Sequence, residues 1–114
     1  MENKLSTRYF SSIQENYVAK KFNARLASNS GGGKFDKGDV LLDNPSFLFE
    51  CKTCVKDKDS FSIKKEWLEK NKEESFAKRK DNSCIVFNFG PNRENYYVIS
   101  EKLMVYLIDK LKGE

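Results

Sequence analysis

The sequence predicts an α/β fold in which a central mixed β-sheet is flanked by helices. Apolar residues recur at helical spacing near both ends of the chain, whereas short runs rich in aromatic and β-branched residues lie between them. A charged segment of good helix formers divides these runs into two groups. The resulting order is helix, two or three strands, helix, two strands and a final helix, which is typical of an α/β domain.

The first predicted helix spans residues 12–26, with a start as early as Ser6. It contains good helix formers and no proline. Val18, Phe22 and Leu26 recur every four residues, so they form an apolar stripe along one side. We expect this stripe to face the sheet.

A hairpin is predicted next. Residues 28–38 are rich in Gly, Ser and Asn and therefore predict a loop. The strand-like run 39–42 is separated from the run 47–53 (FLFECKT) by a turn at 43–45, which contains Asp, Asn and Pro. A turn of this length suggests that the two strands are antiparallel neighbours.

The second half of the chain contains two further helices and two further strands. Residues 63–80 predict a helix with Ile63, Trp67 and Leu68 on one side and highly charged other faces. A break at 81–83 precedes the remaining elements. These are a central strand at 84–90, a strand at 96–99, and an amphipathic helix at 101–112 with Leu103, Leu107 and Leu111 in register.

Composition suits a single domain over residues 1–114. Apolar residues make up 39% and charged residues 33%, which is enough material for a packed core. The net charge of +4 suits a polyanionic partner without demonstrating one. The first ten residues lack the apolar segment of a signal peptide, and no run approaches the ~18 apolar residues that cross a bilayer. We therefore expect a cytoplasmic protein that does not enter a membrane.

The numbers of histidines and cysteines limit which metal sites and catalytic groups this chain can form. The three cysteines, Cys51, Cys54 and Cys84, are an odd number, so free thiols are expected. Cys51 and Cys54 form C-x-x-C, but no histidine completes a zinc site. The absence of histidine also excludes Ser-His and Cys-His nucleophiles. Catalysis would have to use carboxylates, lysines or a metal ion.

Four charged side chains stand where apolar ones would be expected. Glu50 and Lys52 lie two positions apart on a predicted strand, so they share one face, opposite Phe49 and Cys51. Glu15 falls on the apolar stripe of the first helix. Asp39 opens the first strand of the hairpin.

Each of these residues also has a plainer interpretation. Ser12 and Glu15 fit an S-x-x-E capping box at a helix start. Asp39 fits a turn. Glu50 and Lys52 would contribute little if they faced water on an edge strand.

Together, the residues indicate a metal site. Asp39 and Glu50 lie on adjacent strands, and Mg²⁺ prefers such hard oxygen ligands together with substrate phosphate. The ion would polarise a scissile phosphate and acidify a water molecule, while Lys52 would orient that water or offset charge in the transition state.

The pattern Gly38-Asp39 followed by Glu50-Cys51-Lys52, with the helical acid in ENYVAKKF, resembles the PD-(D/E)XK nuclease superfamily. Within it, SGGGKFDKGDV followed by FECKT is most similar to archaeal-type and phage Holliday-junction resolvases, over roughly residues 8–90. Gly38 stands in place of the proline of the nominal motif. The resemblance implies a restriction-endonuclease-like fold and a Mg²⁺-dependent, or Mn²⁺-dependent, endonuclease that resolves four-way DNA junctions. Such a protein would act in the cytoplasm, which is the host cytoplasm for a phage-encoded chain.

The resemblance also assigns residues. Glu15, Asp39, Glu50 and Lys52 would be catalytic, with the three acids binding the metal, and Ser30 would lie near the cleaved backbone. Further DNA contacts are expected at cationic or polar positions around this site, which are Arg8, Gln14, Lys34, Lys37, Lys56, Lys64 and Lys65. The alternative for the lysines is an ordinary solvated surface, because acids are interleaved with several of them.

A homodimer is expected because a four-way junction has two symmetric cut sites. The apolar last helix is interpreted as core packing, with a dimer contact as the alternative. Two other functions remain open: a nuclease of the same fold acting on nicks, flaps or mismatches, and a non-catalytic DNA-binding module.

Overall fold

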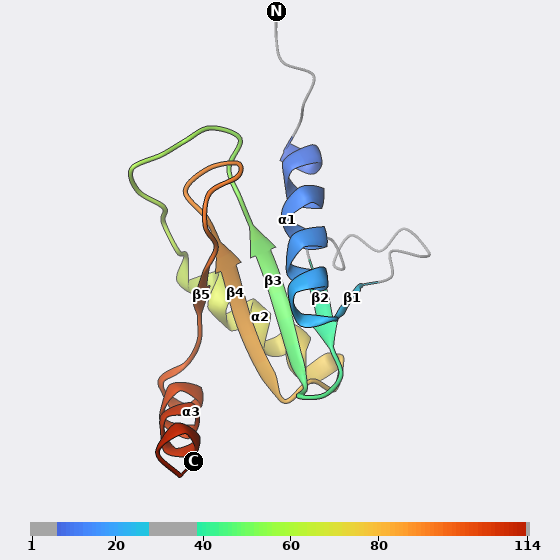
Figure 1. The fold of residues 1–114 in the computed structure, drawn as a ribbon, viewed down its shortest axis with the longest axis vertical. Helices are drawn as coiled ribbons and strands as arrows, with labels where there is room; N and C mark the ends of the chain where they lie inside the picture. The colour runs from blue at the N-terminus through green and yellow to red at the C-terminus, as the bar shows by residue number, and fades with distance from the viewer. Residues whose placement is uncertain (1–6, 28–38, 114) are drawn as a thin grey trace, which may run out of the picture.

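The structure is a computed structural model that describes residues 7–27 and 39–113. One sheet and three helices make up these residues (Figure 1). In chain order the elements are α1 (Thr7–Phe22), β1 (Arg25–Leu26), β2 (Asp39–Leu42), β3 (Phe47–Lys52), α2 (Lys65–Ala77), β4 (Asn82–Phe87), β5 (Tyr96–Val98) and α3 (Glu101–Gly113).

The sheet is mixed, as the sequence predicts. Its strand order is β1-β2-β3-β4-β5, and every neighbouring pair is antiparallel except β3 and β4, which are parallel. The predicted hairpin is confirmed, with β2 and β3 joined by a turn at residues 43–46. β3 is therefore the central strand, hydrogen-bonded on both sides.

Helix ends differ from the predicted ones because two residues adopt left-handed backbone conformations. α1 ends at Phe22 because Asn23 has φ 56°, and the Ala24 N–H then donates to the Ala19 carbonyl at 2.7 Å. Arg79, with φ 59°, ends α2 in the same way. The chain after α1 is thereby freed to form the short strand β1, which the sequence did not predict.

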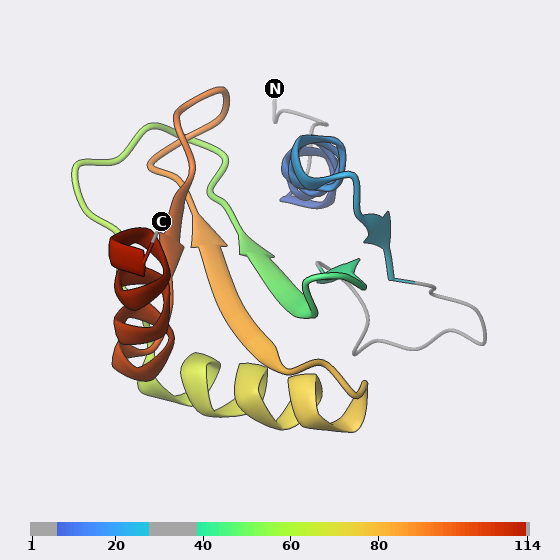
Figure 2. The same cartoon turned by 60° about the horizontal axis from the view of Figure 1, so that its bottom comes forward.

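The two faces of the sheet are covered by different helices. α1 lies over one face and α2 over the other (Figure 2). On the α1 face, Val18 packs against Val40, Phe49, Cys84 and Val86 in an apolar cluster whose members are all buried. This cluster is the main hydrophobic core.

The third helix follows β5. The Ser100 hydroxyl accepts a hydrogen bond from the Leu103 N–H at 3.1 Å, which caps α3 at its start. Leu103 is the one buried residue within α3. No helix within residues 7–27 and 39–113 has both the length and the apolar character of a membrane span.

Candidate metal centre

Three carboxylates converge on the α2 face of the sheet. One oxygen each from Asp39, Glu50 and Glu74 lies within 4.8 Å of the other two. Asp39 opens β2 and pairs with Glu50 of β3 in register, so both side chains point to the same face. Glu74 comes from α2, which covers that face (Figure 2).

This donor set suits a hard divalent cation. Two ionised carboxylates at this separation repel by about 3 kcal/mol at an effective dielectric constant of about 20. Asp39 is 2% exposed, so solvent screens that repulsion poorly. Within the described part of the chain, Glu50 Oε1 is buried without a hydrogen-bond partner. A Mg²⁺ or Mn²⁺ ion would offset the repulsion and supply that oxygen with a partner.

An ammonium group lies beside these acids. Lys52 Nζ is 3.3 Å from Glu50 Oε2 and 4.3 Å from the centre of the Trp67 ring. The Lys52 side chain is 28% exposed. An ion pair with Glu50 and a cation–π contact with Trp67 therefore hold this positive charge beside the carboxylates.

Gln14 supports the strand that carries Lys52. Its Nε2 donates to the Lys52 carbonyl at 2.9 Å, and it is also within hydrogen-bond distance of the Val86 carbonyl and of Asn95 Oδ1. Gln14 is buried at 4% exposure. We expected a DNA contact from Gln14, but its position instead links α1 to the ends of β3 and β4.

Glu15 points inward, but it lies on a different side of the sheet from the acidic group. Its side chain comes from α1 and is buried, and it is not a member of the three-carboxylate group found among the described residues. Burial raises the pKa of Glu15, and Arg8, 3.6 Å away, partly opposes that shift. Because α1 begins at Thr7, Ser12 is inside the helix and the capping-box alternative is wrong.

The other plain interpretations also fail. Asp39 is a buried first residue of β2 rather than a turn residue. Glu50 and Lys52 are on the central strand rather than an edge strand, and their side chains are only 13% and 28% exposed.

The residues predicted to contact DNA lie in different parts of the described chain and have different partners. Arg8 is exposed and paired with Glu15. Lys56 is exposed in the segment before α2, Lys64 Nζ is 5.9 Å from the Trp67 ring centre, and Lys65 pairs with Glu69 at 4.0 Å. Ser30, Lys34 and Lys37 lie outside the described residues. Of these side chains, Lys64 is thus the one shown next to the tryptophan that contacts Lys52.

Sequence reasoning missed Glu74, although a signal for it existed. Glu74 lies three and seven residues after Asn71 and Trp67, so these residues share one side of α2. Asn71 is buried at 2% exposure. An acid on an inward-facing stripe was the reason for selecting Glu15, and the same reasoning applied to the second helix would have selected Glu74.

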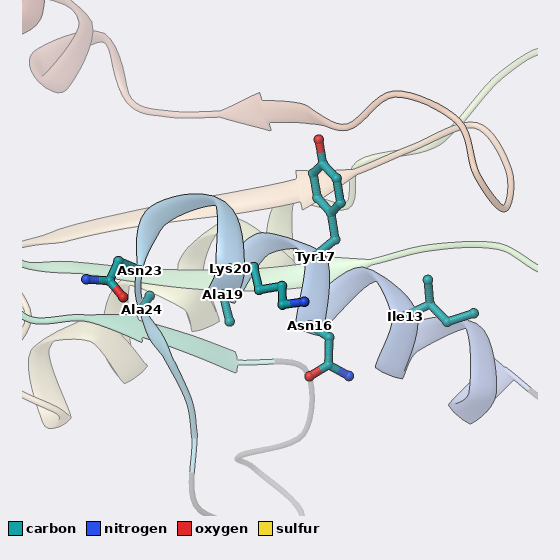
Figure 3. Close-up of a pocket in the computed structure, with 7 residues that line it drawn as sticks. All are labelled: Ile13, Asn16, Tyr17, Ala19, Lys20, Asn23 and Ala24. Atoms are coloured by element: carbon teal, nitrogen blue, oxygen red, sulfur yellow. The ribbon is translucent and has the colours of Figure 1, made fainter.

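The structure also has a pocket along α1, separate from the acidic group (Figure 3). Residues of α1 and of the turn after it line this pocket, including Asn16, Tyr17 and Lys20. Its described lining contains no carboxylate, so it offers no ligand set for a metal ion.

Comparisons of the chain with protein-family models, with curated proteins and with solved structures find no match.

Proposed function

We propose that this protein is a metal-dependent endonuclease with a restriction-endonuclease-like fold, and that it hydrolyses phosphodiesters in four-way DNA junctions. The observation that carries the proposal is the convergence of Asp39, Glu50 and Glu74 beside the ammonium of Lys52. Paired acids on adjacent strands and a lysine two residues after the second acid are the features on which the nuclease resemblance rests.

The geometry and the sequence motif support different parts of the proposal. The carboxylate group supports metal binding, because hard oxygen donors from three elements meet at one point. The substrate class rests on the motif SGGGKFDKGDV followed by FECKT, which resembles junction resolvases. The proposal keeps Asp39, Glu50 and Lys52 in their expected roles and gives Glu74, rather than Glu15, the third metal-binding position.

Each residue of the site has a separate role. Asp39, Glu50 and Glu74 would hold the ion, which supplies positive charge to the phosphate and makes a water molecule more acidic. Lys52 provides a second positive charge next to the phosphate, where negative charge develops during hydrolysis. The Trp67 ring restricts where that ammonium can lie, and the Gln14 amide holds the Lys52 backbone through its carbonyl.

Cleavage of a labelled synthetic four-way junction tests the proposal. We expect nicks in the presence of Mg²⁺ and none after chelation. Asp39→Asn, Glu50→Gln and Lys52→Ala should each reduce the rate by about 100-fold or more, because each removes a charge that acts on the reacting phosphate. The matched control is Glu69→Gln, an exposed acid on α2 that pairs with Lys65 and should leave the rate unchanged.

The outcomes distinguish the alternatives. Robust cleavage by the three site variants would contradict the assignment of the site. Equal cleavage of junctions, linear duplexes and flaps would favour a nuclease for other DNA structures. Tight junction binding without product, under Mg²⁺ or Mn²⁺, would favour a non-catalytic DNA-binding module.

A further inference from the structure

Five aromatic side chains form a connected group next to the candidate metal centre. They come from the segment before α2, from α2, from β4 and the loop after it, and from β5, and they are Phe61, Trp67, Phe87, Phe89 and Tyr96. The centres of contacting rings lie between 5.0 Å and 6.2 Å apart. None of the five rings belongs to the main hydrophobic core, and none is fully buried. Packing of that core therefore does not account for the aromatic group.

The strand register places the aromatic group in line with the ammonium of Lys52. Lys52 of β3 pairs with Phe87 of β4, and Phe87 pairs with Tyr96 of β5. Paired residues of neighbouring strands share a face of the sheet, so these three side chains form one row on the α2 face. Neighbouring strands lie about 4.8 Å apart, so Tyr96 is about 10 Å from Lys52 along this row.

Three of the rings form a stacked column that ends at Tyr96. The Phe61 ring is inclined by 29° to the Phe87 ring, and the Phe87 ring by 31° to the Tyr96 ring. β5 is the last strand of the sheet in the described part of the chain, so the column reaches the sheet edge there. Tyr96 is 46% exposed, and α3 leaves from the other end of β5 (Figure 1). The Tyr96 ring is therefore accessible to a further planar group.

Positive charge at the opposite end of the aromatic group indicates which planar group fits. Lys52 Nζ and Lys64 Nζ lie 4.3 Å and 5.9 Å from the centre of the Trp67 ring. Residues 52–66 contain five lysines and three acids, and one of these acids, Asp57, pairs with Arg93. Ammonium groups bind phosphates and aromatic rings stack on bases, so this combination is typical of surfaces that bind single-stranded nucleic acid.

We propose that Tyr96 stacks an unpaired base of a DNA strand whose phosphate lies beside Lys52. At about 3.4 Å per stacked nucleotide, the row of about 10 Å corresponds to roughly three nucleotides of one strand. The base has to be unpaired, because bases within a duplex already stack on their neighbours. The inference rests on the proposed function for the identity of the nucleic acid as DNA. It adds that the substrate is single-stranded within a few nucleotides of the bond that is cleaved.

Binding of single strands in the presence of a chelator tests this inference separately from cleavage. The probes are a fluorescently labelled oligodeoxythymidine of about 12 nucleotides and a strand of equal length and charge that carries abasic sites. Fluorescence anisotropy should show that the native chain binds the strand with bases about fivefold or more tightly, because a stacked base adds affinity. Repulsion between phosphates and the carboxylates acts on both strands, so it cancels in this ratio.

Substitutions of Tyr96 separate stacking from packing. Tyr96→Phe keeps an aromatic ring and should retain the preference for the strand with bases. Tyr96→Leu keeps an apolar side chain on β5 and should abolish that preference, without weakening binding of the abasic strand. The matched control is Tyr106→Leu on α3, where the tyrosine is 56% exposed, and it should retain the full preference. The comparison of the two strands on the native chain needs no substitution, so it does not depend on how a variant folds.

A lysine variant and the two decisive outcomes complete the test. Lys64→Gln should weaken binding of both strands by a similar factor and lower the slope of log affinity against log salt by about 0.7, because it removes one phosphate contact. Equal binding of the two strands by the native chain would overturn the inference, as would a preference that Tyr96→Leu retains. Either result leaves the proposed cleavage standing, because Mg²⁺-dependent nicking tests it. A preference for bases without any nicking would support the stacking site and contradict the nuclease.

Discussion

The two faces of the central strand β3 carry different side chains over its last four residues, Phe49 to Lys52. Phe49 and Cys51 point to the α1 face, where they join a dry apolar cluster. Glu50 and Lys52 point to the α2 face, where the acids Asp39 and Glu74 lie close by. The backbone is shared, so the difference comes entirely from the alternation of side chains along the strand.

The comparison shows how a chain of this size combines stability with a charged site. On the α1 face, apolar burial supplies stabilisation of about 25 cal/mol per Å² removed from water. On the α2 face, the three carboxylates repel one another in the absence of a cation. Leu48 is fully buried and shares the α2 face with Glu50, so that face also has apolar packing. Substitutions at the carboxylates, rather than anywhere on the α2 face, should therefore have the opposite signature to substitutions on the α1 face.

The largest expected effect is on the α1 face. Phe49 is 4% exposed and stacks on Phe22 and Phe47, with ring centres 5.0 Å and 5.4 Å away. Phe49→Ala should lower the free energy of unfolding by about 3–5 kcal/mol, because it removes buried area and leaves a cavity. Urea denaturation followed by circular dichroism measures this change.

A milder variant and a surface control keep that test informative. Phe49→Leu should cost less than the alanine substitution and leave a folded protein whose response to metal is unchanged. Phe76 is 86% exposed, so Phe76→Ala should change stability by less than about 0.5 kcal/mol. Equal losses for the two alanine variants would contradict the assignment of the core to the α1 face.

The next effect is on the α2 face. Trp67 is the one tryptophan of the chain, and its ring contacts Lys52, which pairs with Glu50. A bound divalent ion competes with Lys52 for Glu50, so titration with Mg²⁺ or Mn²⁺ should change the Trp67 fluorescence. Glu74→Gln should weaken the apparent metal affinity by about tenfold or more, because it removes one ligand.

The stability of the Glu74→Gln variant should respond differently from its metal affinity. Glu74→Gln relieves repulsion among the acids, so we expect no loss of stability without metal and a smaller rise in melting temperature when metal is added. Glu69→Gln, on the exposed side of the same helix, should behave as the native chain. An unchanged metal titration in Glu74→Gln would remove Glu74 from the site.

The smallest effect concerns Glu15, the one acid that α1 turns toward the sheet. Burial raises the pKa of this carboxyl above its ordinary value of 4.5. The folded chain therefore binds the proton more tightly than the unfolded chain, so stability falls as the pH rises from 4.5 through the raised pKa. Near neutral pH, Glu15→Gln should raise the free energy of unfolding by about 1 kcal/mol.

Urea denaturation as a function of pH measures this difference. The gain from Glu15→Gln should shrink as the pH falls through the raised pKa of Glu15 and on below 4.5, where the carboxyl becomes protonated in both the folded and the unfolded chain. Arg8 loses its partner in the variant, but its side chain is 54% exposed, so that loss is small. A gain that does not depend on pH would mean that desolvation of the charged form is not its cause.

The local sequence pattern was sufficient to predict some of these features. The hairpin could be predicted because the turn at residues 43–46 and the alternation of Phe49, Glu50 and Cys51 are both short-range signals. The end of α1 was misplaced because the left-handed conformation of Asn23 outweighed the apolar spacing that continues to Leu26. Asn is a known helix terminator, so that error could have been avoided.

The sequence by itself determined that Glu15, Asp39 and Glu50 turn inward on their own helix or strand. Only the tertiary structure decided which acids meet: Glu74 of α2 joins Asp39 and Glu50, whereas Glu15 lies on α1, which covers the opposite face of the sheet (Figure 2). The reason is that residue periodicity fixes the direction of a side chain relative to its own helix or strand. The face of the sheet on which each helix packs depends instead on contacts between residues far apart in the chain.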